Sequence, residues 1–407
     1  MPRRALNLLF VCSKIPYPAN DGGRIAVFEP MRHLAARGHR VAFLGFGLQE
    51  EADALKDHAD LAWARAIQHD TRTNLLAMIA GLPTSTPYTA GKYRSSAMGK
   101  ALASSIAAEA FDLVQLEQTH MAWYISGVRK AGSIPVLRLQ NIESELMMSF
   151  ARQSRPPVSW YAQMQARRMA AFETQSCRRV DACLAISEED ARWVQQASPT
   201  TRVLVVPAGS EVAPRRDPDL RIGNSILFIG ALDWMPNAQG MRWFAKRVWP
   251  KIKQEVPLAR CVVIGRNPPA DLRRWAEADS NVSVLGFIED VSDFRYRTNA
   301  EIVPILSGGG MRVKILDAFA HGNAVVSTTL GATGIEARDD SEILLADTET
   351  GFAQQVVRLL LNPGLQRRIG DSARARVAER YGWEAVTIRQ EEAYYSILAA
   401  RAQAPKA

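Results

Sequence analysis

The chain has 407 residues, more than one ordinary hydrophobic core accommodates, and this length predicts two domains. Its 47% hydrophobic and 23% charged residues are typical of a folded globular protein and exclude a disordered or fibrous chain. The formal net charge of +8 favours anionic partners, namely nucleotide diphosphates or anionic lipid head groups. Nucleic acid is not expected as a partner, because no RNA- or DNA-binding motif accompanies the charge.

Cysteine and histidine usage limits the chemistry further. The four cysteines have no paired spacing, which argues against a disulfide framework or a zinc site and is typical of a reducing cytoplasm. The six histidines form no spaced cluster, so we expect no protein-bound metal and no cofactor.

The first apolar run, residues 6–12, follows two arginines as a signal peptide would. The run is short, Lys14 interrupts it, and no small-residue cleavage site follows, so a buried first strand is the preferred interpretation. No apolar stretch approaches the ~20 residues that a membrane-spanning helix needs. We therefore expect a cytoplasmic protein that does not cross a membrane.

Strand and helix patterns alternate along the first half of the chain. After the strand at 6–12, a loop rich in proline and glycine leads to a helical pattern at 24–37 that Gly38 closes. Amphipathic stretches at 95–110 and 160–177 separate some of the later strands. The further strands are predicted at 39–45, 61–67, 112–116, 134–139, 182–186 and 203–206.

The same alternation restarts after a polar, proline-rich stretch. Strands are predicted at 225–229, 259–264, 282–285, 301–304, 324–328 and 342–345, with helices at 237–253, 270–277 and 311–320 and a wholly helical segment at 354–398. The fold class is therefore α/β, with two Rossmann-like doubly wound parallel sheets facing each other across a cleft. We predict an N-terminal domain at 1–207, a linker at 208–222, a C-terminal domain at 223–380 and a helix at 381–407 that packs back on the N-terminal domain.

The strongest local signal is a glycine-rich loop that opens a helix. Gly308, Gly309 and Gly310 follow a predicted strand, and glycines allow a ligand to approach the backbone closely. Free amides at a helix start favour anions, and Arg312 and Lys314 add cations at this end of the helix, where they oppose the helix dipole. This pattern predicts a bound anion; the alternative is a tight turn whose basic residues face solvent.

Asp317 lies further along the same helix and is a candidate for hydrogen bonds from ribose hydroxyls, or else a surface carboxylate. Around it, residues 316–326 read Leu-Asp-Ala-Phe-Ala-His-Gly-Asn-Ala-Val-Val. With residues 226–230, 262–265 and 285–291, this phrase resembles, in order, the C-terminal signature of retaining glycosyltransferases of family 4, which have the GT-B fold. Residues 230–237 are similar to a subgroup linked to exopolysaccharide assembly, and residues 16–24 and 181–188 resemble the family's N-terminal phrases.

The resemblance implies a hexosyltransferase that moves a sugar from a nucleotide-diphosphate donor to a glycan or lipid-linked acceptor with retention of configuration, without a metal. Two departures stand out. The family usually has two glutamates eight positions apart, where this chain has Gly309 and Asp317. The family's diphosphate-binding Arg and Lys are also missing from residues 231–237. We infer that Arg312 and Lys314 bind the diphosphate instead, with Asn237 and Arg266 as further donor-binding residues.

The N-terminal domain supplies the acceptor side by family analogy. Gly22 and Gly23 precede a predicted helix, an anion-friendly place, and Arg24 could reach a phosphate or an acceptor; a plain turn is the alternative. His120 follows the predicted strand at 112–116, and family members often place a histidine near the donor sugar here; a surface histidine is the alternative. Glu143 is a weaker candidate of the same kind.

Two other functions stay open. A nucleotide-sugar epimerase of the same fold would need acid–base groups, of which His120 and Glu143 are the obvious ones. A non-catalytic nucleotide-sugar-binding protein would explain the missing first glutamate. A nicotinamide-dependent dehydrogenase is excluded, because no Gly-x-Gly-x-x-Gly follows the first strand.

Basic residues exceed acidic ones by five both in residues 1–40 and in residues 152–179. This bias predicts an anionic membrane surface as a further partner, with the protein peripheral at the inner face of the cell membrane.

Overall fold

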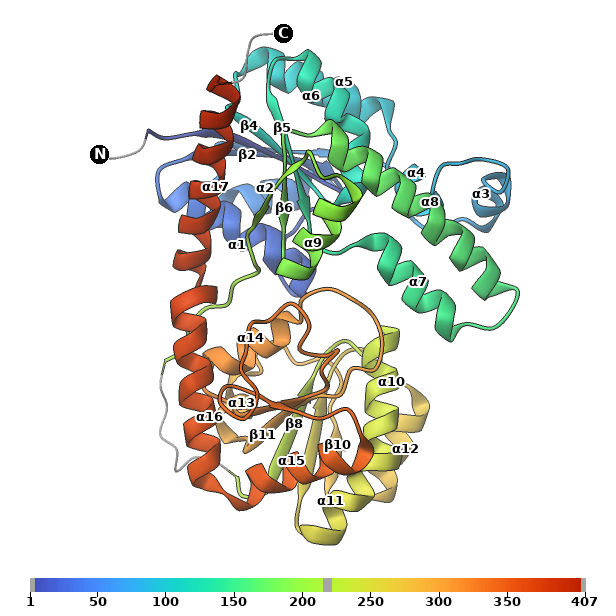
Figure 1. Ribbon diagram of the computed structural model, residues 1–407, viewed down its shortest axis with the longest axis vertical. Helices are drawn as coiled ribbons and strands as arrows, with labels where there is room; N and C mark the ends of the chain where they lie inside the picture. The colour runs from blue at the N-terminus through green and yellow to red at the C-terminus, as the bar shows by residue number, and fades with distance from the viewer. Residues whose placement is uncertain (1–3, 215–221, 404–407) are drawn as a thin grey trace. The chain divides into compact units, whose positions relative to one another are not determined.

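The computed structural model describes residues 4–214 and 222–403 (Figure 1). The chain divides into two compact units, Met1–Ala208 with Val386–Ala407 and Gly209–Ala385, which we call the N-terminal and the C-terminal unit. The predicted linker at 208–222 falls partly on residues 215–221, outside the described residues.

Within residues 4–208, seven strands form one parallel sheet in the order β3-β2-β1-β4-β5-β6-β7. The central strand β1 reads as a continuous apolar run because both faces of a parallel sheet are covered. It pairs Leu8 with Val41 on one side and with Leu113 on the other. The strands are β1 (Asn7–Cys12), β2 (Arg40–Phe46), β3 (Trp63–Ile67), β4 (Leu113–Glu117), β5 (Ile134–Leu139), β6 (Ala182–Ala185) and β7 (Arg202–Val205).

Helices connect these strands, and several begin at a capping side chain. Asp21 caps α1 by accepting from the Arg24 amide, and Ser187 caps α9 in the same way. The helices are α1 (Gly22–Ala36), α2 (Gln49–Ala59), α3 (Leu75–Ala80), α4 (Tyr88–Gly91), α5 (Ser96–Ala108), the 3-10 helix η1 (Thr119–Tyr124), α6 (Ile125–Lys130), α7 (Glu143–Gln153), α8 (Val158–Arg179) and α9 (Glu188–Ala197).

Over residues 222–385, six strands form a second parallel sheet in the order β10-β9-β8-β11-β12-β13. The strands are β8 (Ser225–Ile229), β9 (Arg260–Ile264), β10 (Val282–Val284), β11 (Ala300–Val303), β12 (Val325–Ser327) and β13 (Leu344–Leu345). The helices are α10 (Met235–Trp243), the π-helical turn η3 (Phe244–Val248), α11 (Trp249–Glu255), α12 (Ala270–Ala278), α13 (Ser292–Arg297), α14 (Val313–Ala320), α15 (Glu349–Leu361), α16 (Pro363–Arg376), the π-helical turn η4 (Val377–Tyr381) and α17 (Trp383–Gln403), of which Val386 onward belongs to the N-terminal unit.

The predicted α/β class with two Rossmann-like parallel sheets is confirmed. The segment at 354–398 is not one helix, because Asn362 caps a new helix at Pro363 and Gly382 interrupts the next. Helices α2 and α9 were not predicted. All four cysteines are free and buried.

In each sheet the strand order reverses at one place, between β1 and β4 and between β8 and β11. Loops that leave the carboxyl ends of two such strands run in opposite directions and leave a crevice where ligands of open α/β sheets bind. The fold therefore singles out the loops after β1 and β4 in one unit and those after β8 and β11 in the other.

Close backbone packing at the second of these places needs a glycine. Gly240 of α10 lies against the end of β11, and a Cβ there would lie 2.9 Å from the Pro304 carbonyl carbon and closer still to its oxygen. Gly99 of α5 is a matched control, because a Cβ there meets nothing within 4 Å.

We expect Gly240→Ala to lower the free energy of unfolding by about 2 kcal/mol, because the backbone must shift to admit the methyl group. Gly99→Ala should leave it equal or raise it by about 0.5–1 kcal/mol through helix propensity. Calorimetric melting of both variants tests this pair, and equal midpoints would contradict it.

Candidate functional site

The loops after β8 and β11 contact each other at the switch point of the C-terminal sheet. Ser307 Oγ donates a hydrogen bond to Gln239 Oε1 at 3.0 Å. A Cβ on Gly308 would lie 3.3 Å from Pro236 Cγ, so the glycine-rich loop rests directly on the start of α10. The predicted donor-binding stretch thus lies where the fold places a ligand.

The glycine-rich loop has backbone conformations that side chains disfavour. Gly308 and Gly310 have φ values of +92° and +82°. The loop then turns into α14, whose N-cap residue, Arg312, makes no side-chain capping bond to the helix amides. The amide end of α14 therefore keeps its partial positive charge for a ligand.

Arg312 is a buried cation, with 5% of its surface exposed. Its Nη1 donates to the carbonyl oxygens of Gly309 and Gly310, the latter at 2.7 Å, and its guanidinium lies 5.4 Å from the Trp234 ring centre. Its Nε and Nη2 are buried without a hydrogen-bond partner, and no carboxylate of residues 4–214 or 222–403 forms an ion pair with it. Burial lowers the pKa of Arg312 to about 10, which shows how poorly its charge is compensated.

Lys314, the second residue of α14, provides the second cation. Its Nζ donates to Asn237 Oδ1 at 2.9 Å and lies 4.5 Å from the Phe228 ring centre. A Cβ on Gly230 would collide with this ammonium group, so the glycine at the end of β8 makes room for it. Burial, then the charge of Arg312, lowers the pKa of Lys314 to about 7. A bound anion would raise the pKa of Lys314 again, because an opposite charge favours the protonated amine.

Asp317 lies on the same helix, but its carboxylate has partners within the C-terminal unit. Ser210 Oγ donates to Asp317 Oδ1 at 2.7 Å, and Arg295 Nη2 lies 4.0 Å from Oδ2. Arg295 is itself buried beside Glu301, 3.4 Å away. Asp317 is therefore held by Ser210 and Arg295, and it forms no hydrogen bond or ion pair with Arg312.

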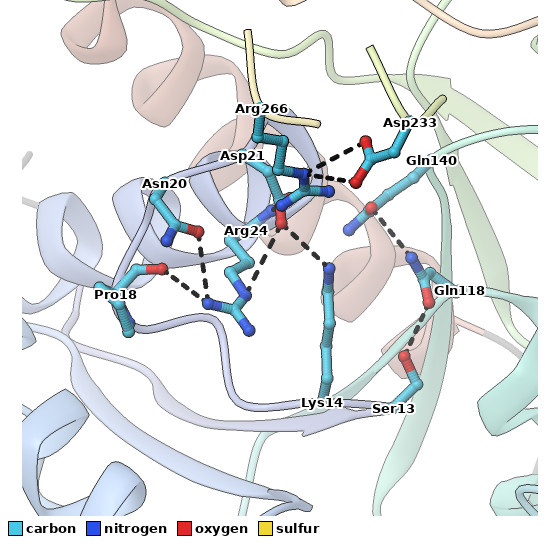
Figure 2. A network of polar contacts seen from close by, with 10 residues as sticks. All are labelled: Ser13, Lys14, Pro18, Asn20, Asp21, Arg24, Gln118, Gln140, Asp233 and Arg266. Atoms are coloured by element: carbon cyan, nitrogen blue, oxygen red, sulfur yellow. Dashed lines mark hydrogen bonds and ion pairs between the residues drawn. The ribbon is translucent and has the colours of Figure 1, made fainter. Parts of the chain in front are cut away.

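Arg266 follows β9 and is paired with an acid that the sequence did not single out. Its Nε donates a hydrogen bond to Asp233 Oδ2 at 3.0 Å (Figure 2). Asn267 Nδ2 donates to the same oxygen at 2.9 Å. These bonds lower the pKa of Asp233, that from Asn267 most. Asp233 lies in the loop where the family pattern has cations, and Arg266 neutralises it.

The first glycine loop is organised by its own polar side chains (Figure 2). Asp21 caps α1 and lies 3.6 Å from Lys14 Nζ and 3.7 Å from Arg24 Nε. Arg24 Nη1 donates to the Pro18 oxygen at 3.1 Å, so Arg24 turns back on the loop. Gly22 and Gly23 are the first residues of α1, whereas the sequence placed them before the helix, and the cap there is already an acid.

A chain of side chains crosses the carboxyl ends of β1, β4 and β5. Ser13 Oγ donates to Gln118 Oε1 at 2.8 Å, and Gln118 Nε2 donates to Gln140 Oε1 at 3.2 Å (Figure 2). Gln140 Nε2 in turn donates to Glu117 at 3.0 Å. Gln118 has a φ of +68°, a strained conformation for a residue with a side chain and one that gathers at functional sites.

His120 is buried in η1, directly after β4. Its ring lies 5.0 Å from that of Tyr93, and its Nδ1 is buried without a hydrogen-bond partner. Burial, then the charge of Lys92, lowers the pKa of His120 to about 4. The imidazole is therefore neutral at physiological pH and can accept or donate one hydrogen bond.

Glu173, which is buried, and Glu143, which is half-buried, form an acidic pair next to η1. Glu173 of α8 accepts hydrogen bonds from the Glu143 and Ser144 amides, at 2.8 and 3.1 Å, and so caps α7 from a distance. Burial raises the pKa of both Glu143 and Glu173 to about 7, with their mutual repulsion adding to that of Glu143. Glu143 also raises the pKa of Tyr93, after burial, which links the pair to the His120 ring.

Known proteins resemble both units. Residues 21–209 match the family model described as the glycosyl transferase 4-like domain, and residues 223–362 match glycosyl transferases group 1. A Klebsiella pneumoniae protein described as an uncharacterized 44.6 kDa protein in the cps region is 21% identical over 391 residues, which cover 92% of this chain and 96% of that protein.

Solved structures agree with these matches. Sucrose-phosphate synthase from Thermosynechococcus elongatus superposes with a TM-score of 0.71 at 16% identity, over 97% of this chain and 100% of the other. HepE from Anabaena, solved in complex with UDP and glucose, has a TM-score of 0.67 at 11% identity, over 96% and 100%. Both units are glycosyltransferase domains. Their fold is of the GT-B type, as the sequence predicted.

Within this glycosyltransferase, the sequence identified Arg312, Lys314 and Asn237, which the structure brings together. It missed Glu173, because a glutamate in the middle of a long helix carries no signal of the distant amides it caps. It also missed Trp234, whose ring covers Arg312. Among residues 4–214 and 222–403, no helix combines the length and the hydropathy that a bilayer span requires.

We expect the Lys314 ammonium of the glycosyltransferase to titrate near pH 7, because burial disfavours its charged form. NMR of protein labelled with ¹³C at the lysine ε-carbon should show one resonance shifting near neutral pH and missing from Lys314→Met. The spectrum of Lys314→Met is the control, because it identifies the resonance that belongs to Lys314. A Lys314 resonance that does not move between pH 6 and pH 8 would contradict the uncompensated site.

Proposed function

We propose that this glycosyltransferase moves a hexosyl group from a nucleotide-diphosphate donor to a glycan or lipid-linked acceptor, with retention of configuration, in polysaccharide biosynthesis. The observation that carries the proposal is the buried guanidinium of Arg312, two of whose nitrogen atoms lack partners. A buried cation without a carboxylate is costly unless a ligand completes it. The glycine loop and the start of α14 make that ligand an anion that can approach a backbone, as a diphosphate does.

The two cations have distinct tasks in this proposal. Arg312 offers Nε and Nη2 as adjacent donors, the planar geometry that suits phosphate oxygens. Lys314 supplies a point charge held by Asn237. Departure of the nucleotide diphosphate concentrates negative charge on the leaving oxygen, and preorganised cations lower the energy of that transition state. In this proposal no metal or cofactor is required.

We use the relatives to choose the donor nucleotide and the product to test. HepE was solved with UDP and glucose, and we take UDP as the first nucleotide to test. The Klebsiella relative comes from a cps region, which supports polysaccharide as the product. Retention of configuration rests on the resemblance of residues 316–326 to family 4. His120, neutral and with Nδ1 open, is the proposed hydrogen-bonding group for the transferred sugar.

One observation favours a second candidate, a nucleotide-sugar epimerase. The charge of Glu143, after burial, raises the pKa of Tyr93, whose ring lies 5.0 Å from that of His120. Burial raises the pKa of Glu143 itself to about 7, and an acid–base group needs a pKa near the operating pH. An epimerase would exchange a sugar-ring hydrogen with solvent, and a transferase would not.

A donor panel separates these functions. We expect UDP release from one UDP-sugar to rise at least tenfold when a lipid-linked or glycan acceptor is present, and to persist in EDTA, with an α-linked product from an α-linked donor. Deuterium incorporation from D₂O without UDP release would instead identify the epimerase. Nucleotide binding without either reaction would identify a binding protein.

We expect Arg312→Ala/Lys314→Ala to weaken nucleotide-diphosphate binding at least 100-fold in calorimetry, about 2.7 kcal/mol, because both compensating charges are lost. Arg358→Ala is the control, since Arg358 lies on α15 and already has a carboxylate partner in Asp340, and it should change affinity less than threefold. Wild-type affinity should also fall as the pH rises from 7 to 9, because Lys314 must then take up a proton to bind the anion. Unchanged affinity in the double variant would refute the site.

A further inference from the structure

Two stretches of the N-terminal unit contain no acidic residue at all. They are residues 71–108 and 146–172, in a chain that has 42 acidic residues among 407. Both stretches are basic, with Arg72, Lys92, Arg94, Lys100, Arg152, Arg155, Arg167 and Arg168. Such separation of charge is a feature of surfaces that meet an anionic partner.

Large apolar side chains are exposed in the same stretches. None of the residues of α3 is buried, and Leu75 and Leu76 are 68% and 77% exposed, with Ile79 and Leu82 also exposed. Phe150, near the end of α7, and Val158 and Trp160, at the start of α8, are also exposed, and 67% of the Trp160 surface is accessible. Scattered exposed apolar residues are ordinary, but a group of this size indicates an interaction surface.

The two stretches are joined into one surface by hydrogen bonds. Arg168 of α8 donates to the Gly81 and Leu82 oxygens, at 3.0 and 2.5 Å, just after α3. Gln165 Oε1 accepts from the Tyr88 amide at 2.8 Å, and Tyr88 OH accepts from the amide of Asn74, the cap of α3. Figure 1 shows α3 standing out from the sheet of its unit on the side of α8. We call residues 72–82 with 150–168 the α3–α8 surface.

Three exposed arginines of this surface lack side-chain partners, whereas Arg72 pairs with Asp70 and Arg168 donates to the Gly81 and Leu82 oxygens. Among the described part of the chain, no hydrogen bond or ion pair engages the guanidinium groups of Arg152, Arg155 or Arg167, all of them exposed. By contrast, Arg40 and Arg129 of the same unit are paired with Glu109 and Asp181. The charge of the α3–α8 surface is therefore available to a partner.

We propose that the α3–α8 surface docks on an anionic phospholipid bilayer. Leucine, isoleucine and tryptophan side chains enter the boundary between head groups and acyl chains, and the arginines bind lipid phosphates. A second copy of the chain fits less well, because a two-fold contact would set the same arginines against each other. Docking holds the enzyme at the surface where a lipid-linked acceptor resides. This benefit rests on the proposed function, whereas the docking itself does not.

The full chain is tested by co-sedimentation with vesicles of phosphatidylcholine containing ~30% phosphatidylglycerol, and with pure phosphatidylcholine. We expect binding to the anionic vesicles at least tenfold stronger than to the neutral ones, and loss of most of it between 50 and 500 mM salt. Leu75→Ser/Leu76→Ser should reduce binding at least fivefold. Leu258→Ser/Leu361→Ser, which alters equally exposed leucines of the C-terminal unit, should not.

A charge pair of variants completes the test. Arg152→Gln/Arg155→Gln/Arg167→Gln should reduce binding at least tenfold, and Arg273→Gln/Arg274→Gln/Arg367→Gln, with the same change in net charge, less than twofold. Equal effects of the two triple variants, or no vesicle binding at 50 mM salt, would overturn the proposal. So would self-association in sedimentation velocity that only the Leu75/Leu76 variant abolishes. Nucleotide binding, measured on every variant, should stay unchanged and reports separately on the proposed function.

Discussion

An unpaired positive charge determines the site of the C-terminal unit. Two cations, Arg312 and Lys314, lie within one turn of each other at the start of α14, and no carboxylate of the described residues forms an ion pair with either. Burial lowers the pKa of both cations, and the charge of Arg312 lowers that of Lys314 further. Several neighbouring residue choices are consequences of this arrangement. Gly230 leaves room for the ammonium group, Asn237 accepts a hydrogen bond from it, and Trp234 presents the face of its ring to the guanidinium. These contacts orient the cations but supply no negative charge, which a ligand must bring.

The position of this imbalance follows from topology. The loops after β8 and β11 meet because the strand order reverses between those strands, so residues some seventy positions apart in sequence come together. The corresponding loops of the N-terminal unit carry paired charges and uncharged polar groups. Asp21 pairs with Lys14 and Arg24, and Ser13, Gln118 and Gln140 form a chain of amide and hydroxyl groups. The C-terminal unit thus offers unpaired cations, which suit a diphosphate, and the N-terminal unit offers hydrogen-bonding groups, which suit sugar hydroxyls.

Strands, fold class and the donor-binding cations were predictable because each leaves a local signal. Continuous apolar runs predict buried parallel strands, and three glycines before Arg312 and Lys314 predict an anion site at a helix start. What the sequence could not supply were contacts between distant side chains. Nothing near Asp317 indicates that Ser210 donates to it, and nothing near Arg266 indicates that Asp233 pairs with it. The segment at 354–398 is helical as predicted, but the sequence pattern did not show that it is divided at Asn362 and Gly382.

The unusual titration of Lys314 has a chemical consequence of its own. An ordinary lysine with a pKa of ~10.4 has a free amine in only about one molecule in 2,500 at pH 7. With its pKa lowered to about 7, Lys314 has a free amine in roughly half of the molecules. While no anion is bound, this amine is a nucleophile in the anion site, and an uncharged aldehyde would condense with it, with loss of water, to form an imine. Bound nucleotide would protonate the amine and protect it, so covalent labelling of this one lysine would report occupancy of the site in an intact cell extract.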